Sequence, residues 1–403
     1  MNLPAATRAV YAVFILSGFA FASWASRIPS VRDSLELSPQ SLGLVLLAMA
    51  VGSVIAMPLA GVVVGRFGTA RTITLMALLG ATGLALAGFG QSIGVLPVAI
   101  GLFLFGAGNG TWDVAMNVEG SAVEQQLGKA IMPRFHAGFS VGTVAGALIG
   151  SGMVALDVSP SVHLSAVAVL VAVAAPTAVR SFLAIAAPEE HEERRGNPLA
   201  AWTEPRTLLI GVFVFAAAFT EGTGNDWLAV ATIDGYDAAD ALGTFTFALF
   251  LSAMTLGRWF GPAVLDRYGR VATLRVLSLT ALVGLTLVVF GGSLPVAMAG
   301  AVLWGIGTAL GFPVGMSAAS DEPTHAAARV SVVATVGYVA FLAGPPLIGF
   351  LADDVGTLRA LTVTGGLVAL GLLVSGALRA PEPMSSAGAG RLVSEPPVDR
   401  SPP

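Results

Sequence analysis

Long apolar stretches that follow one another along nearly the whole chain are the feature that most constrains its fold. A window of about 19 residues separates them into twelve segments of roughly 20 to 24 residues, each long enough to cross about 30 Å of hydrocarbon. Because lipid offers no hydrogen bonds to the backbone, such segments must be helical. The sequence therefore predicts an all-α membrane protein with spans near 9–26, 40–64, 72–91, 95–118, 132–156, 161–183, 207–228, 241–264, 272–291, 295–318, 330–351 and 358–378.

The composition excludes other classes of protein. Charged residues make up 11% of the 403 residues and hydrophobic residues 55%, whereas soluble domains carry about 25% charged residues. Disordered chains are poor in apolar residues, so the high apolar content excludes an intrinsically disordered chain. The 49 glycines lack the Gly-X-Y period of collagen, which excludes a collagen-like protein. Cysteine is absent, which excludes disulfides, thiolate zinc sites and cysteine nucleophiles.

The placement of basic residues predicts the orientation. If both termini are cytoplasmic, Arg27, Arg32 and Arg359 lie at the outer face, and the other basic residues fall inside or near the inner ends of helices. This bias follows the positive-inside rule. Arg8 and the apolar run after it could also be read as a secretory signal, but eleven further spans favour a first membrane helix.

A central charged segment, 188–206, divides the spans into six and six. We therefore predict an N-terminal half over 1–185, a cytoplasmic linker over 186–206 and a C-terminal half over 207–380. The tail 381–403 is rich in Pro, Ser and Gly and is expected to be disordered.

Three short internal repeats support this division, because they fall in corresponding helices at offsets of 199 to 201 residues. They are Leu104–Gly108 with Leu303–Gly307, Leu148–Gly150 with Leu347–Gly349, and Arg66–Gly68 with Arg267–Gly269. Two parallel six-helix halves related by an axis along the membrane normal are a transporter architecture.

The loop after the eighth span, Asp266-Arg267-Tyr-Gly-Arg270, resembles the D-R-x-G-R loop motif of the major facilitator superfamily. The resemblance implies a gating loop in which Asp266 caps the cytoplasmic start of the span 132–156. An acid near a helix N-terminus is stabilising by roughly 0.3–1 kcal/mol. The matching loop has Gly65 before Arg66 where the family has the acid, so the two cytoplasmic latches should be unequal. The alternative is that these arginines simply follow the positive-inside rule.

A second resemblance is more specific. Gly110–Asn117 is similar to the acid-x-A-x-N segment of fucose:proton symporters, in which the acid of the fourth helix is a proton site. Met132–Gly142 and Glu221–Trp227 resemble a bacterial inner-membrane subgroup nearby, which implies a multi-pass protein of the bacterial cytoplasmic (inner) membrane. The acid that fucose symporters carry in helix 1 has no counterpart between Tyr11 and Trp24, so the resemblance does not imply the substrate.

Asn109, Asp113 and Asn117 form one polar stripe on the fourth span, because they are spaced by four residues. An ionisable group within a span is a functional candidate by default. One interpretation is that Asp113 exchanges protons while the asparagines bind substrate or orient the acid. The other is a buried hydrogen-bond network between helices.

His136 is the expected partner of Asp113, since both lie about 6–8 Å from the cytoplasmic helix ends at 1.5 Å per residue. A neutral histidine near an acid could relay protons at physiological pH. Arg134 could instead hold Asp113 ionised, and His136 could equally serve the structure of a gate.

Glu221 is a second intramembrane acid and a further candidate for proton coupling. It lies about 21 Å from the start of its span, with Asn225, a candidate for substrate binding, one turn later. Asp226 is expected near the outer boundary and solvated. The structural alternative for Glu221 is a salt bridge to Arg27 when the outer side is closed.

Aromatic residues are the remaining candidates for substrate binding. Phe21 and Trp24 share one face of the first span, and Trp112 and Trp304 lie in spans four and ten. The resembling family lines its cavity with helices 1, 4, 7 and 10. Packing of these rings in the core is the alternative.

Small residues and prolines predict how the helices pack and bend. Gly138, Gly142, Gly146 and Gly150 form a small-residue face for close helix contact. Pro313 and the Pro345–Pro346 pair should kink spans ten and eleven.

The functional hypothesis is a secondary transporter working by alternating access. No Walker loop, H-E-x-x-H motif, nucleophile elbow or separate basic patch is found, so we expect no enzyme, cofactor, metal or nucleic-acid partner. The expected partners are a small-molecule substrate, protons and the lipid bilayer, and the expected state is a monomer. Proton-coupled import of a sugar-like solute is the first hypothesis. Proton-driven efflux of an amphipathic compound, or a membrane sensor that does not transport, are the alternatives.

Overall fold

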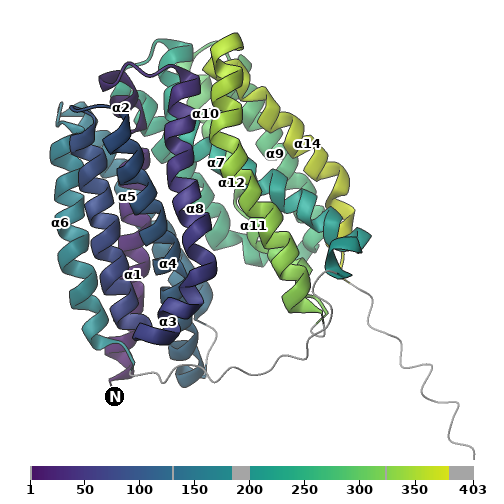
Figure 1. Cartoon of the computed structure of the whole chain (residues 1–403). Coiled ribbons are helices and arrows are strands. Elements are labelled where there is room, and N and C mark those ends of the chain that lie inside the picture. The colour runs from purple at the N-terminus through teal and green to yellow at the C-terminus, as the bar shows by residue number, and fades with distance from the viewer. Residues whose placement is uncertain (1, 129–130, 184–199, 323–324, 381–403) are drawn as a thin grey trace, which may run out of the picture.

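The computed structural model describes residues 2–128, 131–183, 200–322 and 325–380, and the described part is almost entirely helical (Figure 1). The α-helices are α1 (Leu3–Ala25), α2 (Ile28–Ser34), α3 (Pro39–Gly90), α4 (Val95–Leu127), α5 (Met132–Ala155), α6 (Pro160–Ala178), α7 (Pro205–Tyr236), α8 (Asp240–Tyr268), α9 (Arg270–Phe290), α10 (Leu294–Thr308), α11 (Gly311–Ala319), α12 (Ala326–Val355), α13 (Thr357–Ala360) and α14 (Thr362–Val374). Three short 3-10 helices are η1 (Val179–Ser181), η2 (Ala200–Thr203) and η3 (Ser375–Leu378).

These helices confirm the twelve predicted spans. Eleven helical segments of the described chain are long and apolar enough to cross a membrane. One of them, α3, has 52 residues and contains a sharp turn at Gly68 (φ 75°, ψ 165°), so it comprises two spans. Gly269 between α8 and α9 has nearly the same backbone angles (φ 78°, ψ 163°). This conformation is almost restricted to glycine, which explains glycine at both positions of the repeated loop motif.

The internal repeats mark equivalent packing in the two halves. A side chain at Gly106 of α4 would collide with the carbonyl of Met49 in α3. A side chain at Gly305 of α10 would collide in the same way with Phe250 of α8. Of the predicted boundaries, residues 184–199 of the linker and the tail 381–403 lie outside the described residues.

The glycine face of α5 makes the close helix contact that the spacing predicted, and its partner is α1. Side chains at Gly142 and Gly146 would collide with or crowd the backbone carbonyls of Ile15 and Phe19. This close backbone approach makes α1 and α5 one of the most intimate helix pairs of the N-terminal half.

The tenth span is broken into α10 and α11 just before Pro313. Proline has no N–H, so the carbonyl of Ala309, four residues earlier, lacks its helical donor. The kink predicted at Pro313 is therefore confirmed as a break. Pro345 and Pro346, in contrast, lie inside the continuous helix α12.

The two halves are joined at the end of the molecule opposite the termini, which we call the far end (Figure 1). Arg32 Nη1 lies 2.7 Å from both carboxylate oxygens of Asp234. Ser151 Oγ donates to Ala241 O over 3.0 Å, and the backbone N of Gln40 donates to Asp353 over 3.3 Å. Among the described residues, all hydrogen bonds and ion pairs that cross between the halves lie at this end.

Candidate functional site

The polar stripe of α4 forms one wall of the candidate site. Asn109, Asp113 and Asn117 are all half-buried. Ser17 Oγ of α1 lies 2.9 Å from Asn109 Oδ1, and Asn117 Nδ2 lies 2.8 Å from the Asp113 carbonyl and 3.4 Å from its carboxylate. Among the described residues Asp113 has no ion-pair partner, and the alternative contact with Arg134, which is exposed, is not formed.

Glu221 and Arg258 form a second polar wall. Arg258 Nη2 of α8 lies 2.8 Å from both carboxylate oxygens of Glu221 in α7. Arg258 Nε donates to the carbonyl of Ala309 over 3.2 Å. This is the carbonyl that Pro313 leaves without a helical donor, so the break in the tenth span provides the second anchor of the guanidinium.

The salt bridge to Arg27, the structural alternative considered for Glu221, is therefore not formed. The far end is closed in this structure, yet Glu221 binds Arg258, and Arg27 Nε instead donates to His163 Nδ1 over 2.9 Å. A carboxylate at Glu221 is thus already neutralised by a neighbouring helix of its own half.

Charged and polar residues of the two halves come near one another across the interface. The charge of Arg258 acts on His136 of α5, and the charge of Asp113 acts on Tyr338 of α12. His136 is exposed, and its ring lies edge-on to Phe14 with centroids 5.2 Å apart. The structure therefore brings His136 near Arg258 and Asp113 near Tyr338, in each case from different halves, while the partnership of Asp113 with His136 stays a prediction.

Asn225 and Asp226 follow Glu221 on α7. Both residues are half-buried, and Asn225 Oδ1 is buried without a hydrogen-bond partner. No hydrogen bond or ion pair to Asp226 is found among the described residues. The expectation that Asp226 is solvated therefore stays a prediction.

Most of the aromatic candidates are closed to a solute in this conformation. The exposed fractions of Trp24, Trp112 and Trp304 are 1%, 2% and 0%. Trp304 packs edge-on against Phe250, with ring centroids 5.3 Å apart. Phe21 is half-buried. The alternative of core packing therefore describes these three tryptophans here, and a role in binding would require another conformation.

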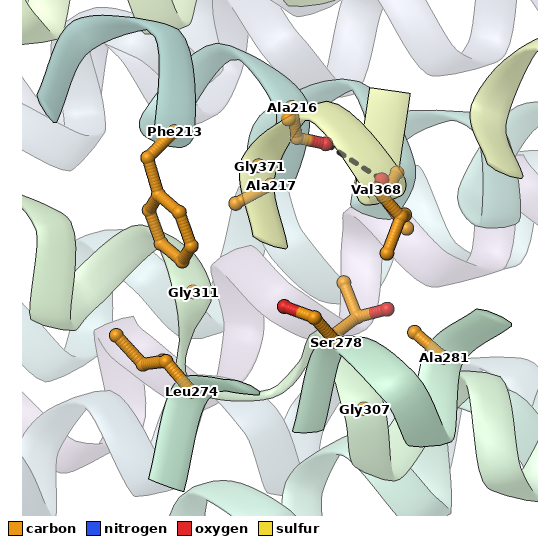
Figure 2. Close-up of a pocket in the computed structure, with 12 residues that line it drawn as sticks. Phe213, Ala216, Ala217, Leu274, Ser278, Ala281, Gly307, Gly311, Val368 and Gly371 are labelled. Atoms are coloured by element: carbon orange, nitrogen blue, oxygen red, sulfur yellow. Dashed lines mark hydrogen bonds between the residues drawn. The ribbon is translucent and has the colours of Figure 1, made fainter. Parts of the chain in front are cut away.

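A small cavity lies wholly within the C-terminal half, between α7, α9, α14 and the break of the tenth span (Figure 2). Its lining is mainly apolar and small, with Ser278 and Phe213 among the labelled residues. A volume of about 30 Å³ is close to that of one water molecule. The cavity is too small for a sugar and lies apart from the two polar walls.

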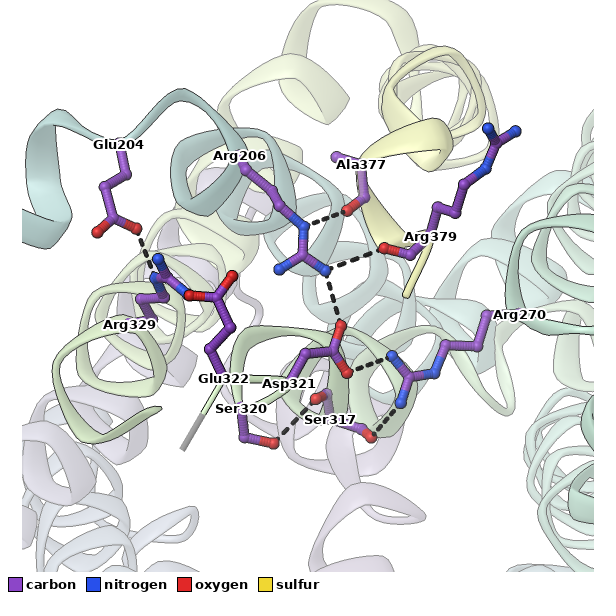
Figure 3. Close-up of polar contacts among 10 residues, drawn as sticks. All are labelled: Glu204, Arg206, Arg270, Ser317, Ser320, Asp321, Glu322, Arg329, Ala377 and Arg379. Atoms are coloured by element: carbon purple, nitrogen blue, oxygen red, sulfur yellow. Dashed lines mark hydrogen bonds and ion pairs between the residues drawn. The ribbon is translucent and has the colours of Figure 1, made fainter. Parts of the chain in front are cut away.

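The helix ends on the side of the termini, which we call the terminal end, carry a second polar cluster (Figure 3). Asp321, whose side chain is 8% exposed, lies 2.7 Å from Arg206 and 2.6 Å from Arg270. Glu204 accepts from Arg329 over 2.6 Å, and this hydrogen bond lowers the pKa of Glu204. The cluster joins the ends of α7, α9, α11 and α12.

The N-terminal half has a matching junction at Glu119, which is completely buried. Glu119 accepts from Thr69 Oγ1 over 2.6 Å and from the backbone N of Leu183 over 2.7 Å. Glu119 and Asp321 are 202 residues apart, and their partners Thr69 and Arg270 are 201 apart. The two acids are therefore equivalents in the internal repeat.

The loop motif contributes differently from what the resemblance implied. Arg270 binds Asp321, whereas Asp266 is exposed and has no hydrogen bond or ion pair among the described residues. Arg66 and Arg267 lie over the rings of Phe67 and Tyr268 at 5.7 and 5.3 Å. The latch between Asp266 and the start of α5 remains a prediction for a conformation in which the terminal ends of the halves meet.

Comparison with known proteins decides the family. The sequence profile of the Major Facilitator Superfamily matches residues 10–345 and 237–395. An uncharacterised MFS-type transporter of Yersinia pestis is 33% identical over 363 residues, which is 89% of this chain and 91% of the relative. The chain belongs to the major facilitator superfamily.

Solved transporters of this superfamily share the fold. The nucleoside transporter NupG matches with a TM-score of 0.74 at 14% identity, covering 94% of this chain and 98% of NupG. FucP, the fucose:proton symporter of E. coli, matches in its outward conformation with a TM-score of 0.64 at 15% identity, covering 92% of this chain and 98% of FucP. The fold and transporter class predicted from the loop motif are thereby confirmed.

Four charged or polar residues of this superfamily member were missed by sequence reasoning. Arg258 was counted only as a basic residue of the inner side, and Tyr338 lacks any motif. Glu119 and Asp321 would have been found by extending the repeat to a 202-residue offset.

Proposed function

We propose that this transporter carries a neutral solute rich in hydroxyl groups, such as a sugar or nucleoside, together with protons that bind at Asp113. The observation that supports it best is the asymmetry of the two carboxylates, Asp113 and Glu221. Glu221 is neutralised by Arg258, whereas within the described part of the chain Asp113 has only the amide of Asn117 as a side-chain partner. A proton bound at Asp113 therefore changes the net charge of the site, while one bound at Glu221 would first have to break an ion pair.

The solute class follows from the groups that the walls present. The amides of Asn109, Asn117 and Asn225 offer both donors and acceptors, which suits hydroxyl groups. The positive charge of Arg258 is already neutralised, which disfavours an anionic solute. The nucleoside and fucose transporters that share the fold are consistent with a sugar moiety.

We also propose that the terminal end faces the cytoplasm. Arg66, Arg267 and Arg270 lie at this end, as the positive-inside rule requires. Because the halves are joined at the far end, the structure then corresponds to an inward-facing state with Asp113 reached from the cytoplasm. Alternation would separate the far ends and bring the terminal ends together around the bound solute.

The test is transport in proteoliposomes, with labelled sugars, nucleosides and amphipathic compounds as solutes and an imposed pH gradient. We expect accumulation driven by the gradient in the wild type. Asp113→Asn should lose at least about 90% of it because an amide cannot be protonated, yet should keep solute exchange at equal pH. Asp237→Asn is the matched control, since Asp237 is exposed and asparagine tolerates its left-handed backbone (φ 50°).

Each outcome tests one part of the proposal. Unchanged accumulation in Asp113→Asn would contradict its role as the proton site. Exchange of amphipathic compounds alone would contradict the solute class and support efflux. Binding without flux for every solute would support the sensor. The sign of the accompanying pH change in the lumen distinguishes symport from antiport.

A further inference from the structure

Arg27 is buried at the far end without any acidic partner. Its exposed fraction is 2%, and it belongs to no ion pair among the described residues. Arginine is almost never fully buried unless it is paired, because an uncompensated charge in a low-dielectric interior is costly. The contact that replaces a carboxylate here is His163 of α6, whose Nδ1 accepts the hydrogen bond from Arg27 Nε.

This contact requires a neutral imidazole. The lone pair of Nδ1 accepts the Arg27 N–H, so the ring proton must lie on Nε2. Nε2 of His163 and Nη2 of Arg27 are both buried and find no hydrogen-bond partner in the part of the chain that the structure describes. A second proton on the ring would occupy Nδ1, remove the acceptor and place two positive charges side by side in a buried site.

The surroundings of His163 offer no acid to compensate that charge. Its exposed fraction is 3%, and among the described residues Arg27 is the charged group whose field acts on it. The neighbouring elements contribute Gly150 of α5, which leaves just enough room for the serine that precedes Arg27, and the neutral contact of Gln91 with Ser161. Protonation of His163 is therefore incompatible with the packing seen here.

The pair is linked directly to the contact that closes the far end. Arg27 is the N-cap residue of the seven-residue helix α2, and its carbonyl accepts from Val31 N over 3.0 Å. α2 carries Arg32, which reaches across to Asp234 of α7. A displacement of Arg27 must therefore move the start of the helix that holds the far-end ion pair.

We infer that His163 is a proton-binding site at the outer side that controls the outer gate. When His163 is neutral, the Arg27–His163 contact holds α2 in place and the far ends closed. When His163 binds a proton, the repulsion of Arg27 displaces α2 and favours the outward-open state. His163 lies only three residues, about 4.5 Å along the helix, from the start of α6, so it is buried close to the outer end of its span.

This inference relies on the proposed orientation but is independent of Asp113 and of the solute. It is tested by double electron–electron resonance on nitroxide labels, in lipid nanodiscs without solute, at pH 5 and pH 8. The chain has no cysteine, so Leu156→Cys and Ser293→Cys provide the only two labelling sites. Both positions are exposed at the far end of different halves.

We expect the label-to-label distances to widen at pH 5 in the otherwise wild-type protein. A proton bound in one conformation only can change the ratio of open to closed populations by up to about tenfold per pH unit. His163→Gln keeps an acceptor for Arg27 but cannot be protonated, so it should stay closed at both pH values. His325→Gln, an exposed histidine of the other half, is the matched control and should respond as the wild type does.

Distances that do not change with pH in the wild-type background would overturn the inference, as would a response that persists in His163→Gln. If His163→Gln is not monodisperse after purification, Arg27→Gln provides the same test. It removes the positive charge that opposes protonation and should also lose the response. A persisting response in Arg27→Gln contradicts the inference as well.

Discussion

Arg258 illustrates how one missing hydrogen-bond donor determines the position of a charge elsewhere in the chain. Pro313 leaves the Ala309 carbonyl free, and Arg258 Nε occupies it. The remaining nitrogen on that side of the guanidinium then binds Glu221. A charged side chain in the middle of α8 is tolerated because both of its partners come from within the protein.

We predict that Glu221 and Arg258 act as a unit. Glu221→Gln or Arg258→Gln alone leaves one charge without its partner, so each should lower solute exchange at least about tenfold and reduce thermal stability. The double variant removes both charges and should recover most of the stability but not the transport. Thermal unfolding and exchange in proteoliposomes are the measurements. Additive losses of stability in the double variant would show that the pair is not coupled.

Asp113 and Arg258 show which functional residues could and could not be identified from the sequence. Asp113 was found from the sequence because an acid in an apolar span stands out and its asparagine neighbours share its face. Arg258 was not found, since its role depends on a carbonyl fifty-one residues away. The burial of Trp24 and Trp304 could not be predicted either, because an aromatic residue on a cavity-lining helix can point into the cavity or into the core.

At the scale of elements, a close helix contact of α5 was predicted from glycine spacing alone, but its partner, α1, was not. The four glycines recur every four residues, which places them on one face, and the structure shows the backbone of α1 on that face. The α10–α11 break was likewise predictable from Pro313. Pro345 and Pro346 have a different effect, because both lie inside one helix, α12, and do not break it, so the bend expected there stays a prediction.

We predict that Gly142 cannot be replaced without separating α1 from α5. Even the methyl group of Gly142→Ala would collide with the Ile15 carbonyl, and a backbone cannot yield as a flexible side chain can. Gly142→Ala should lower stability by about 1–3 kcal/mol, as over-packing does. Gly152→Ala in the same helix is the control, since its Cβ meets nothing within 4 Å, and it should stay within about 0.5 kcal/mol. Equal thermal unfolding of both variants would contradict the packing.

At the scale of the whole molecule, the sequence repeats predicted two equivalent halves, and the structure extends the equivalence to their polar junctions. Glu119 with Thr69 and Asp321 with Arg270 occupy corresponding places. The partner of Glu119 is the neutral Thr69, whereas the partner of Asp321 is the positively charged Arg270. The two halves therefore share the same helix arrangement but differ in the charges at this junction. Which end of the molecule is closed could not be predicted, because both states use the same spans and the same hydrophobic pattern.

The contact between Arg32 and Asp234 provides the test of that closure. It is an ion pair that crosses between the halves, whereas Arg32 also binds Asp33 of its own helix. Asp234→Asn should therefore weaken only the closed state. For a partly exposed pair we expect a change of about 0.2–1 kcal/mol, which is at most about a fivefold rise in the ratio of open to closed populations. Asp33→Asn is the matched control, because its contact with Arg32 stays within one half and should be present in both states.

The measurement is the separation of labels at Leu156→Cys and Ser293→Cys at pH 8, where His163 is neutral and the proposed outer proton site does not contribute. We expect the distribution of distances to be wider in Asp234→Asn than in the wild type, and to be unchanged in Asp33→Asn. Exchanging the charges in an Arg32→Asp, Asp234→Arg double variant should restore closure, because attraction between the halves depends on opposite charges and not on which half carries which. A double variant that stays open would show that local geometry, rather than the charge pair, closes the far end.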